Sequence, residues 1–191
     1  LKEVFQHQEF RPFQEEIIYS VLSGKHSLGI LPTGAGKSLC YQIPGLMLPG
    51  VTIVVSPLIA LMSDQMKGLQ KRDIKVAGIF GNMRPEQIDI ALDNCKYGGV
   101  KFLFLSPERL NSFLLKTRIE QMEVSLFVID EAHCVSQWGH DFRPSYLNIQ
   151  VLREWHPGTP CLALTATCTP AVKKDILELL NIPKATVFQG S

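Results

Sequence analysis

The sequence predicts an α/β fold in which helices cover both faces of a mainly parallel β-sheet. Short apolar segments of strand length alternate along the chain with longer segments whose apolar residues recur every three or four positions. Several short segments, such as 51–56, are apolar at nearly every position, which is typical of strands buried on both faces. The chain has 191 residues, of which 46% are apolar, so it can bury the core of a single domain.

The elements follow one another in strand–helix order. A helix is predicted over 57–72, where Leu58, Met62, Met66 and Leu69 lie near a period of 3.6 residues. Segment 85–94 is similar, and in 170–180 Thr169 is the expected N-cap, with Pro170 at the first helical position. A further helix should follow residue 38, and Pro44 is expected to end or kink it early. The predicted strands span residues 26–31, 51–56, 76–80, 101–106, 126–129 and 161–165.

Charge and cysteine content exclude several classes of protein. The formal net charge is +1, so any nucleic-acid binding must depend on local clusters and not on an overall basic field. The five cysteines contain no C-x-x-C pair, which argues against a disulfide framework and against zinc in this segment, and favours free thiols in an intracellular compartment. No apolar run reaches about 18 residues and the first residues show no signal-peptide pattern, so no membrane association is expected.

A glycine-rich loop, PTGAGKS at 32–38, follows the first predicted strand and precedes a helix. Its glycines let backbone N–H groups approach phosphate oxygens, and the helix N-terminus favours an anion. In this setting Lys37 would reach the β- and γ-phosphates of ATP and Ser38 would ligate Mg²⁺, although Leu31 stands where the usual P-loop opens with Gly. A loop that merely turns the chain is the alternative. The predicted nucleotide-binding residues of this loop are Thr33, Gly34, Ala35, Gly36, Lys37 and Ser38.

An apolar segment at 126–129 leads directly into the acidic sequence DEAH. Asp130 is predicted to hold Mg²⁺, and Glu131 to polarise the attacking water as general base, so both count with Lys37 as catalytic residues. Two acids at a strand end could arise by chance, but adjacent strands would bring them beside the phosphate loop. His133 is predicted as a fourth catalytic residue, which would connect the γ-phosphate side to the DNA side. A purely structural role is the alternative.

The acidic motif continues into CVSQWGHDFRP at 134–144, which resembles the aromatic-rich loop of RecQ helicases. Trp138 and Phe142 are large aromatics in a polar, glycine-containing loop, which suits them to stack on bases. The resemblance implies that this loop senses single-stranded DNA and couples it to hydrolysis, and that Arg143 links it toward the ATP site. Gln137 and His140 are included among the predicted DNA-binding or coupling residues.

Residues 1–14 resemble the adenine-recognition motif of the same family, although Gln6 and His7 stand where Gly and Tyr are frequent. By this resemblance Gln14 would pair with the adenine edge, with Arg11 and His7 stacking on the ring. The start of an ordinary amphipathic helix would explain the Phe-Arg-x-x-Gln pattern equally well.

Three further segments resemble motif Ia (54–65), motif Ib (106–110) and motif III (164–167) of this family. Ser56 and Ser106 follow predicted strands, where they would either help hold DNA phosphates or simply cap the next helix. Thr165 and Thr167 lie at a strand end, where their hydroxyls could hydrogen-bond the acidic motif and couple nucleotide state to strand separation.

The resemblance extends over the whole chain and implies that 1–191 is the first RecA-like domain of an ATP-dependent 3′→5′ DNA helicase in repair, recombination or replication. Its partners would be single-stranded or partly duplex DNA and a second RecA-like domain in cis. That domain, with its arginine finger, and the zinc-binding and winged-helix regions are expected outside this chain. Because a missing finger lowers rates by about 10³–10⁵ in related NTPases, we expect the isolated segment to be nearly inactive.

Other functions remain open at this stage. A translocase that tracks on DNA without unwinding would carry the same motifs, and a non-catalytic nucleotide- or DNA-binding module is a second alternative. A P-loop kinase is a third, against which the aromatic-rich loop counts. The sequence leaves the oligomeric state open, and the location would be the cytoplasm or nucleoid of a bacterium or the nucleus of a eukaryote.

Overall fold

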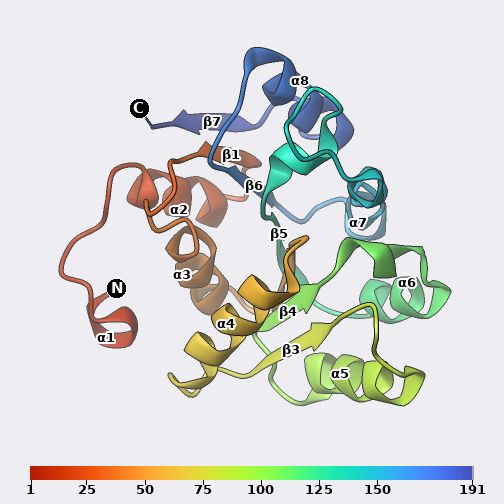
Figure 1. Cartoon of the computed structure of the whole chain (residues 1–191). Coiled ribbons are helices and arrows are strands. Elements are labelled where there is room, and N and C mark those ends of the chain that lie inside the picture. The colour runs from red at the N-terminus through yellow and green to blue at the C-terminus, as the bar shows by residue number, and fades with distance from the viewer. Residues whose placement is uncertain (191) are drawn as a thin grey trace.

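A computed structural model describes residues 1–190, in which seven strands form a single parallel sheet of order β3-β4-β2-β5-β6-β1-β7 (Figure 1). All six predicted strands are confirmed within one or two residues at each end, and their side chains are mostly buried. The strands are β1 Ser27–Ile30, β2 Val51–Val55, β3 Val76–Ile79, β4 Phe102–Leu105, β5 Val124–Ile129, β6 Cys161–Thr165 and β7 Thr186–Gln189.

Helices cover both faces of the sheet, as the α/β prediction requires. Side chains of α2, α3 and α4 build the core on one face, and those of α5, α6, α7 and α8 build it on the other. The α-helices are α1 Lys2–Phe5, α2 Gln14–Leu22, α3 Leu39–Met47, α4 Ile59–Gln70, α5 Pro85–Tyr97, α6 Phe113–Glu120, α7 Val151–Trp155 and α8 Pro170–Leu179. Short 3₁₀ helices are η1 Pro107–Asn111, η2 Ala132–Val135 and η3 Pro144–Asn148.

The predicted helices are confirmed, but of the two effects expected of Pro44, an early end of the helix is not observed. The Thr169 hydroxyl caps α8 by accepting from Val172 N at 3.3 Å, as expected. Helix α3, however, does not end at Pro44 but continues to Met47. Its residues Cys40–Gly45 are all buried, so tertiary packing offsets the hydrogen bond that Pro44 cannot donate. In residues 1–190 no helix has the length and apolar character needed to cross a membrane.

The strand order also corrects an expectation. The phosphate loop follows β1 and the acidic motif follows β5, but these strands are not neighbours, because β6 lies between them and pairs with both. The register sets Thr165 opposite Ile30 and Ala163 opposite Ile129. The end of β6 is therefore placed between the two motifs, at the carboxyl edge of the sheet where ligands of such folds bind.

Strand β7 was not anticipated from the sequence. It pairs with β1 at the edge of the sheet, and its residues Thr186–Gln189 are exposed or only half-buried. An edge strand of this kind needs no continuous apolar run, so its sequence lacks the signal that revealed the other six.

Candidate nucleotide and nucleic-acid site

The phosphate loop turns back on itself through two glycines. Gly34 and Gly36 have φ angles of +83° and +74°, a left-handed conformation that a side chain would strain. A Cβ atom at Gly36 would also overlap the side-chain nitrogen of Gln14. The Lys37 ammonium donates to the Leu31 carbonyl at 3.3 Å, which holds it against the start of the loop. Thr33 and Gly34 are exposed, while Ala35, Lys37 and Ser38 are half-buried.

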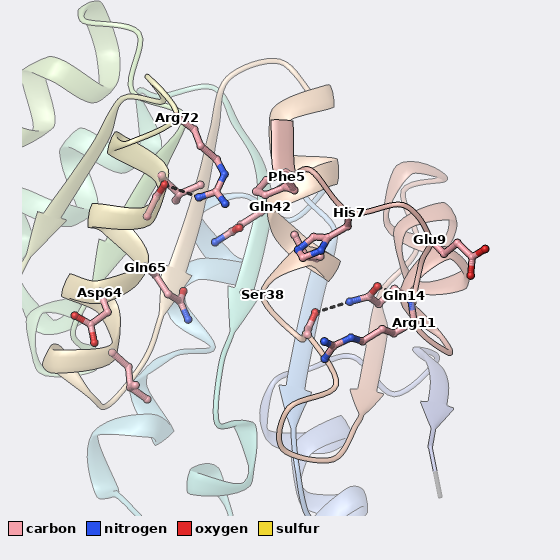
Figure 2. A pocket seen from close by; sticks show the side chains of 15 residues that line it. Phe5, His7, Glu9, Arg11, Gln14, Ser38, Gln42, Asp64, Gln65 and Arg72 are labelled. Atoms are coloured by element: carbon pink, nitrogen blue, oxygen red, sulfur yellow. Dashed lines mark hydrogen bonds between the residues drawn. The ribbon is translucent and has the colours of Figure 1, made fainter. Parts of the chain in front are cut away.

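A pocket of about 410 Å³ lies beside this loop. Five residues that were predicted to bind nucleotide come together in its wall, namely His7, Arg11, Gln14, Gly36 and Ser38 (Figure 2). The opposite wall is formed by α4, which supplies Leu61, Asp64, Gln65, Gly68 and Leu69. The structure therefore unites the proposed adenine motif with the phosphate loop in one cavity.

Gln14 is engaged with the loop itself. Its amide nitrogen donates to the carbonyls of Gly36 at 2.9 Å and Ala35 at 3.3 Å, and its oxygen accepts from Arg11 N at 2.8 Å. The Arg11 guanidinium donates to the Gly34 carbonyl. Both ends of the Gln14 amide are thus already bonded, so pairing with an adenine edge would require these bonds to be exchanged. Its role toward adenine stays a prediction, whereas its role in shaping the loop is evident.

Arg72 was missed by sequence reasoning. It donates to the Val4 carbonyl at 3.1 Å and to the Gly68 carbonyl at 2.8 Å, and its guanidinium carbon lies 5.3 Å from the centroid of the Phe5 ring. Figure 2 shows Arg72 and Phe5 together at one end of the pocket. This contact fastens the N-terminal helix α1 to the end of α4.

The acidic pair lies at the end of β5. The Asp130 backbone carbonyl accepts from the Tyr146 hydroxyl at 2.8 Å, and its carboxylate accepts from Glu131 N at 2.9 Å. Glu131 adopts a left-handed φ of +50°, which is uncommon for a residue with a side chain. Burial, followed by the charge of Glu131, raises the pKa of Asp130 to about 6.

These two carboxylates suit a divalent cation. The raised pKa of Asp130 shows that its negative charge is poorly compensated, although Lys37 partly offsets it. A hard cation with oxygen ligands would neutralise this charge. Carboxylate oxygens of this kind fit Mg²⁺, and the assignment of Asp130 and Ser38 as its ligands stays a prediction.

His133 connects the acidic motif to the end of β6. Its Nδ1 lies 2.8 Å from the Thr165 hydroxyl, and that hydroxyl donates to the Thr167 carbonyl at 3.1 Å. The hydroxyl proton is thereby occupied, so Nδ1 must be the donor to Thr165. The same Nδ1 is 3.4 Å from a Glu131 carboxylate oxygen, and burial lowers the pKa of His133, so the ring is neutral at neutral pH. The expected bond between motif III and the acidic motif is present.

The aromatic-rich loop is mixed in its exposure. The Trp138 side chain is 77% exposed and Gln137 is exposed, whereas Phe142 is half-buried. The exposed His140 ring stacks on His133, with ring centroids 4.6 Å apart and an interplanar angle of 17°. The loop therefore reaches the acidic motif through this pair of imidazoles, which sequence reasoning did not identify.

Arg143 contacts its own loop. Its guanidinium pairs with Asp141 at 3.3 Å and its backbone N–H donates to the Cys134 carbonyl at 2.9 Å. In this arrangement Arg143 holds the loop together, and its predicted link toward the ATP site stays a prediction.

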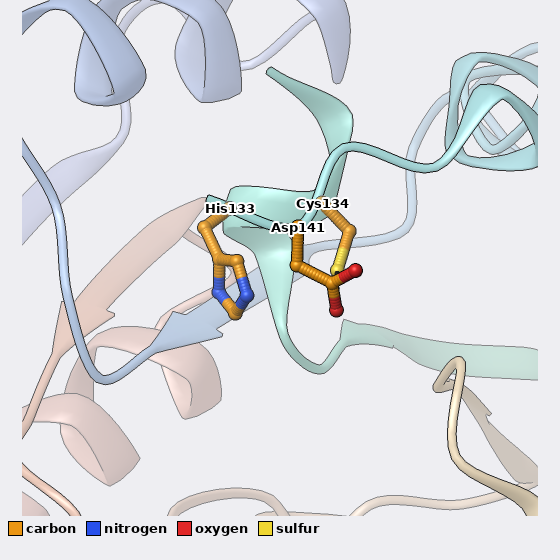
Figure 3. Close-up of side chains that lie close together, drawn as sticks. All are labelled: His133, Cys134 and Asp141. Carbon is orange, nitrogen blue, oxygen red and sulfur yellow. Dashed lines mark hydrogen bonds between the residues drawn. The ribbon is translucent and has the colours of Figure 1, made fainter. Parts of the chain in front are cut away.

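His133, Cys134 and Asp141 form a cluster whose possible ligand atoms lie within 4.8 Å of one another (Figure 3). Other interactions of these three side chains disfavour metal binding. The His133 Nδ1 bonds Thr165, and Asp141 pairs with Arg143. Burial raises the pKa of the Cys134 thiol to about 12, so the thiolate that a metal needs is unfavourable. We therefore interpret these three side chains as contacts between the acidic motif and the aromatic-rich loop, and not as a metal site.

Ser56 and Ser106 are buried at the carboxyl ends of β2 and β4. Their backbone N–H groups donate within the sheet, to Leu105 O at 3.3 Å and to Ile79 O at 3.1 Å. The Ser56 hydroxyl accepts from Leu58 N at 3.4 Å, which is a local capping role. Their contact with DNA phosphates stays a prediction, and it would need groups other than these N–H donors.

Comparison with known proteins agrees with this geometry. A sequence model of the DEAD/DEAH box helicase family matches residues 11–176. The chain is 46% identical to the ATP-dependent DNA helicase RecQ of Bacillus subtilis, covering 100% of this chain and 33% of that protein. It is 45% identical to the RecQ-like DNA helicase BLM of Xenopus laevis, covering 95% of this chain and 14% of that one. The chain thus spans a third or less of these two relatives.

Solved structures show the same fold. The Hef helicase domain of Pyrococcus furiosus superposes with a TM-score of 0.73 at 23% identity, covering 98% of this chain and 39% of that one. The helicase MrfA, bound to DNA and AMPPNP, also gives 0.73 at 20% identity, covering 94% of this chain and 26% of that one. Fold, site geometry and sequence agree: the chain belongs to the DEAD/DEAH box helicase family.

Proposed function

We propose that this chain is the ATP-binding half of a RecQ-type helicase that moves 3′→5′ on DNA and serves repair, recombination or replication. The observation that carries the proposal is the connection from an exposed Trp138 loop to the acidic motif through the stacked rings of His140 and His133. Such a connection suits a protein in which a bound base influences nucleotide hydrolysis. Similarity along the whole of this chain to proteins named RecQ helicases supports the same class.

ATP would bind with its base in the pocket beside α4 and its phosphates on the loop at 32–38. His7 and Arg11 line that pocket, and Lys37 lies at the edge of the loop. Glu131, which follows Asp130 in a left-handed backbone conformation, would take a proton from water. Mg²⁺ held by Asp130 and Ser38 would neutralise phosphate charge.

The exposure of the phosphate loop supports a second domain as a further partner. The phosphate loop residues Thr33 and Gly34 are exposed, as expected for a site completed by a second RecA-like domain in cis. This domain would supply the arginine finger, so the 191 residues alone would hydrolyse ATP poorly. We place the protein inside the cell, in agreement with five free cysteines, four of them buried.

The test measures ATP hydrolysis by the complete protein with and without a single-stranded oligonucleotide. Trp138→Ala should remove the stimulation by DNA, because it deletes the exposed stacking surface. Tyr97→Ala is the matched control, since Tyr97 is equally exposed at 77% but lies on α5, away from the loop. Stimulation that survives Trp138→Ala would refute the proposal.

Direction and unwinding are tested separately with duplexes that carry a single-stranded tail at one end. The proposal expects separation of duplexes with a 3′ tail and none with a 5′ tail. Movement along DNA without strand separation would identify a translocase instead.

A further inference from the structure

A buried serine connects the aromatic-rich loop to helix α8. The Ser136 side chain is fully buried, and its hydroxyl donates to the carboxylate of Asp175 at 2.6 Å. The same hydroxyl oxygen accepts from the backbone N–H of Trp138 at 3.1 Å. A hydroxyl has one proton and two lone pairs, so a single group serves both contacts. The 2.6 Å distance is typical of a hydroxyl bound to an ionised carboxylate.

These contacts determine how Trp138 is presented. Gly139 N donates to the Ser136 carbonyl at 3.2 Å and closes a turn around Trp138. A Cβ atom at Gly139 would lie 2.9 Å from the His133 carbonyl, so the turn is packed closely against η2. The backbone of Trp138 is held by Ser136, while its indole ring is exposed to solvent.

Helix α8, which carries Asp175, is fixed by its packing in the core and by its N-terminal cap. Val172 and Ile176, on either side of Asp175 in sequence, are buried in the core, and the Thr169 hydroxyl caps the helix. The helix also packs against η2. It begins shortly after Thr165, the last residue of β6, which bonds His133. Asp175 thus joins the loop to the element that follows motif III.

We propose that Asp175 is a positioning residue, which holds the Trp138 turn in the geometry that binds a DNA base through the Ser136 hydroxyl. Asp175 lies outside every motif that the sequence singled out. The inference rests on the proposed function, because it assumes that Trp138 stacks on DNA. Its consequence is that loss of the Asp175 carboxylate weakens the response to DNA and leaves nucleotide binding as it is.

The experiment titrates an oligothymidine against ATP hydrolysis by the complete protein. Asp175→Ala should raise the DNA concentration for half-maximal stimulation about tenfold, the effect of losing one charged hydrogen bond. The KM for ATP should stay unchanged. Asp175→Asn retains an acceptor oxygen and should restore most of the response. Glu178→Ala, an exposed acid on the same helix, is the matched control and should behave as the parent protein.

Hydrogen–deuterium exchange of the peptide over 134–143 gives a readout independent of activity. Ser136→Ala removes the acceptor of the Trp138 N–H, and Asp175→Ala removes the carboxylate that orients this acceptor, so both should speed exchange in this peptide. The double variant should be no worse than Ser136→Ala alone, since Asp175 acts on the turn only through the Ser136 hydroxyl. Additive effects, or a Ser136→Ala titration that matches the parent, would overturn the inference.

The Trp138 and Asp175 variants distinguish failure of the proposed function from failure of the positioning role. If Trp138→Ala keeps its stimulation by DNA, the proposed function is wrong. If Trp138→Ala loses stimulation but Asp175→Ala responds at the parent's DNA concentration, only the positioning role is wrong. Asp175→Ala could lower the melting temperature while the KM for ATP and the DNA concentration for half-maximal stimulation stay unchanged. That result would assign Asp175 a structural role and would also overturn the positioning role.

Discussion

The Nδ1 of His133 lies 2.8 Å from the hydroxyl of Thr165, and this hydrogen bond joins the acidic motif to the neighbouring strand β6. Both side chains are buried, His133 at 5% and Thr165 at 0% exposure, so water cannot replace either partner. Because β6 lies between β1 and β5, the bond sits between the phosphate loop and the acidic residues. A conformational change at the phosphate loop or at the acidic motif would therefore act on the hydrogen bond between His133 and Thr165.

Thr165→Val should lower ATP turnover in the complete protein with little change in the KM for ATP. Valine keeps the shape of threonine but offers no acceptor, which leaves the buried His133 N–H with only the 3.4 Å contact to Glu131. An unsatisfied buried group costs about 1–3 kcal/mol. The free energy of unfolding, measured by urea denaturation, should fall by an amount in that range.

Two neighbouring variants control this result. Thr165→Ser keeps the hydroxyl and should preserve most of the activity. Thr167→Val should be nearly silent, because Thr167 is exposed and contributes only its carbonyl to Thr165. Equal losses in all three variants would contradict a specific role for the Thr165 hydroxyl.

Asp130→Asn should stabilise the protein above pH 6 in the absence of Mg²⁺. Burial and then Glu131 raise the pKa of Asp130 from 3.8 to about 6, which corresponds to about 3 kcal/mol. The folded state binds this proton more tightly than the unfolded state, so stability falls as the pH rises from about 4 to 6. The cost is fully present above pH 6 and absent below pH 4.

Urea denaturation of both proteins from pH 4 to pH 8 measures this difference. Asp73→Asn, at an exposed position before the start of β3, is the control and should leave the pH profile as it is. Mg²⁺ binding to the parent protein, followed by calorimetry, should weaken below pH 6 because the metal requires the carboxylate. Identical pH profiles for parent and Asp130→Asn would show that the charge of Asp130 is compensated in another way.

The sequence predicted the sheet well because parallel strands buried on both faces are read directly as apolar runs. It missed β7, whose Thr186–Gln189 segment is half-exposed at the sheet edge. It also placed the two nucleotide motifs on adjacent strands, since periodicity reports which residues form strands and carries no information on their order. The insertion of β6 became visible only through the pairing of Ala163 with Ile129.

The site was predicted by residue type, but its contacts were not. Motif spacing identified Gln14 and Arg143, yet Gln14 bonds the phosphate loop and Arg143 pairs with Asp141. These outcomes depend on side-chain geometry. The partnership of Ser136 with Asp175, which lie 39 residues apart, depends on how α8 packs and leaves no local pattern in the sequence.

Glu131→Gln should bind nucleotide but release almost no phosphate. The amide retains the size of the side chain and its place at the left-handed backbone position, but it cannot accept a proton from water. Binding of a fluorescent ATP analogue and release of phosphate, measured on the same sample, separate the two effects. Glu123→Gln, just before the other end of β5, is the matched control. Turnover at the parent rate in Glu131→Gln would exclude Glu131 as the base.

Arg72→Ala should weaken nucleotide binding through α1. The guanidinium joins α4 to α1 by its bond to the Val4 carbonyl and by its position over Phe5, which lines the pocket with His7. Because Arg72 is exposed, the expected effect is small, about a two- to fivefold rise in the dissociation constant for ATP.

Arg72→Lys separates the two contributions of this side chain. Lysine keeps a cation near Phe5 but lacks the planar group that reaches the Val4 and Gly68 carbonyls together, so its affinity should lie between those of the parent and Arg72→Ala. Lys71→Ala, the exposed neighbour, is the control for charge and should bind ATP as the parent does. If removal of residues 1–5 weakens ATP binding while Arg72→Ala does not, α1 contributes to the pocket without this contact.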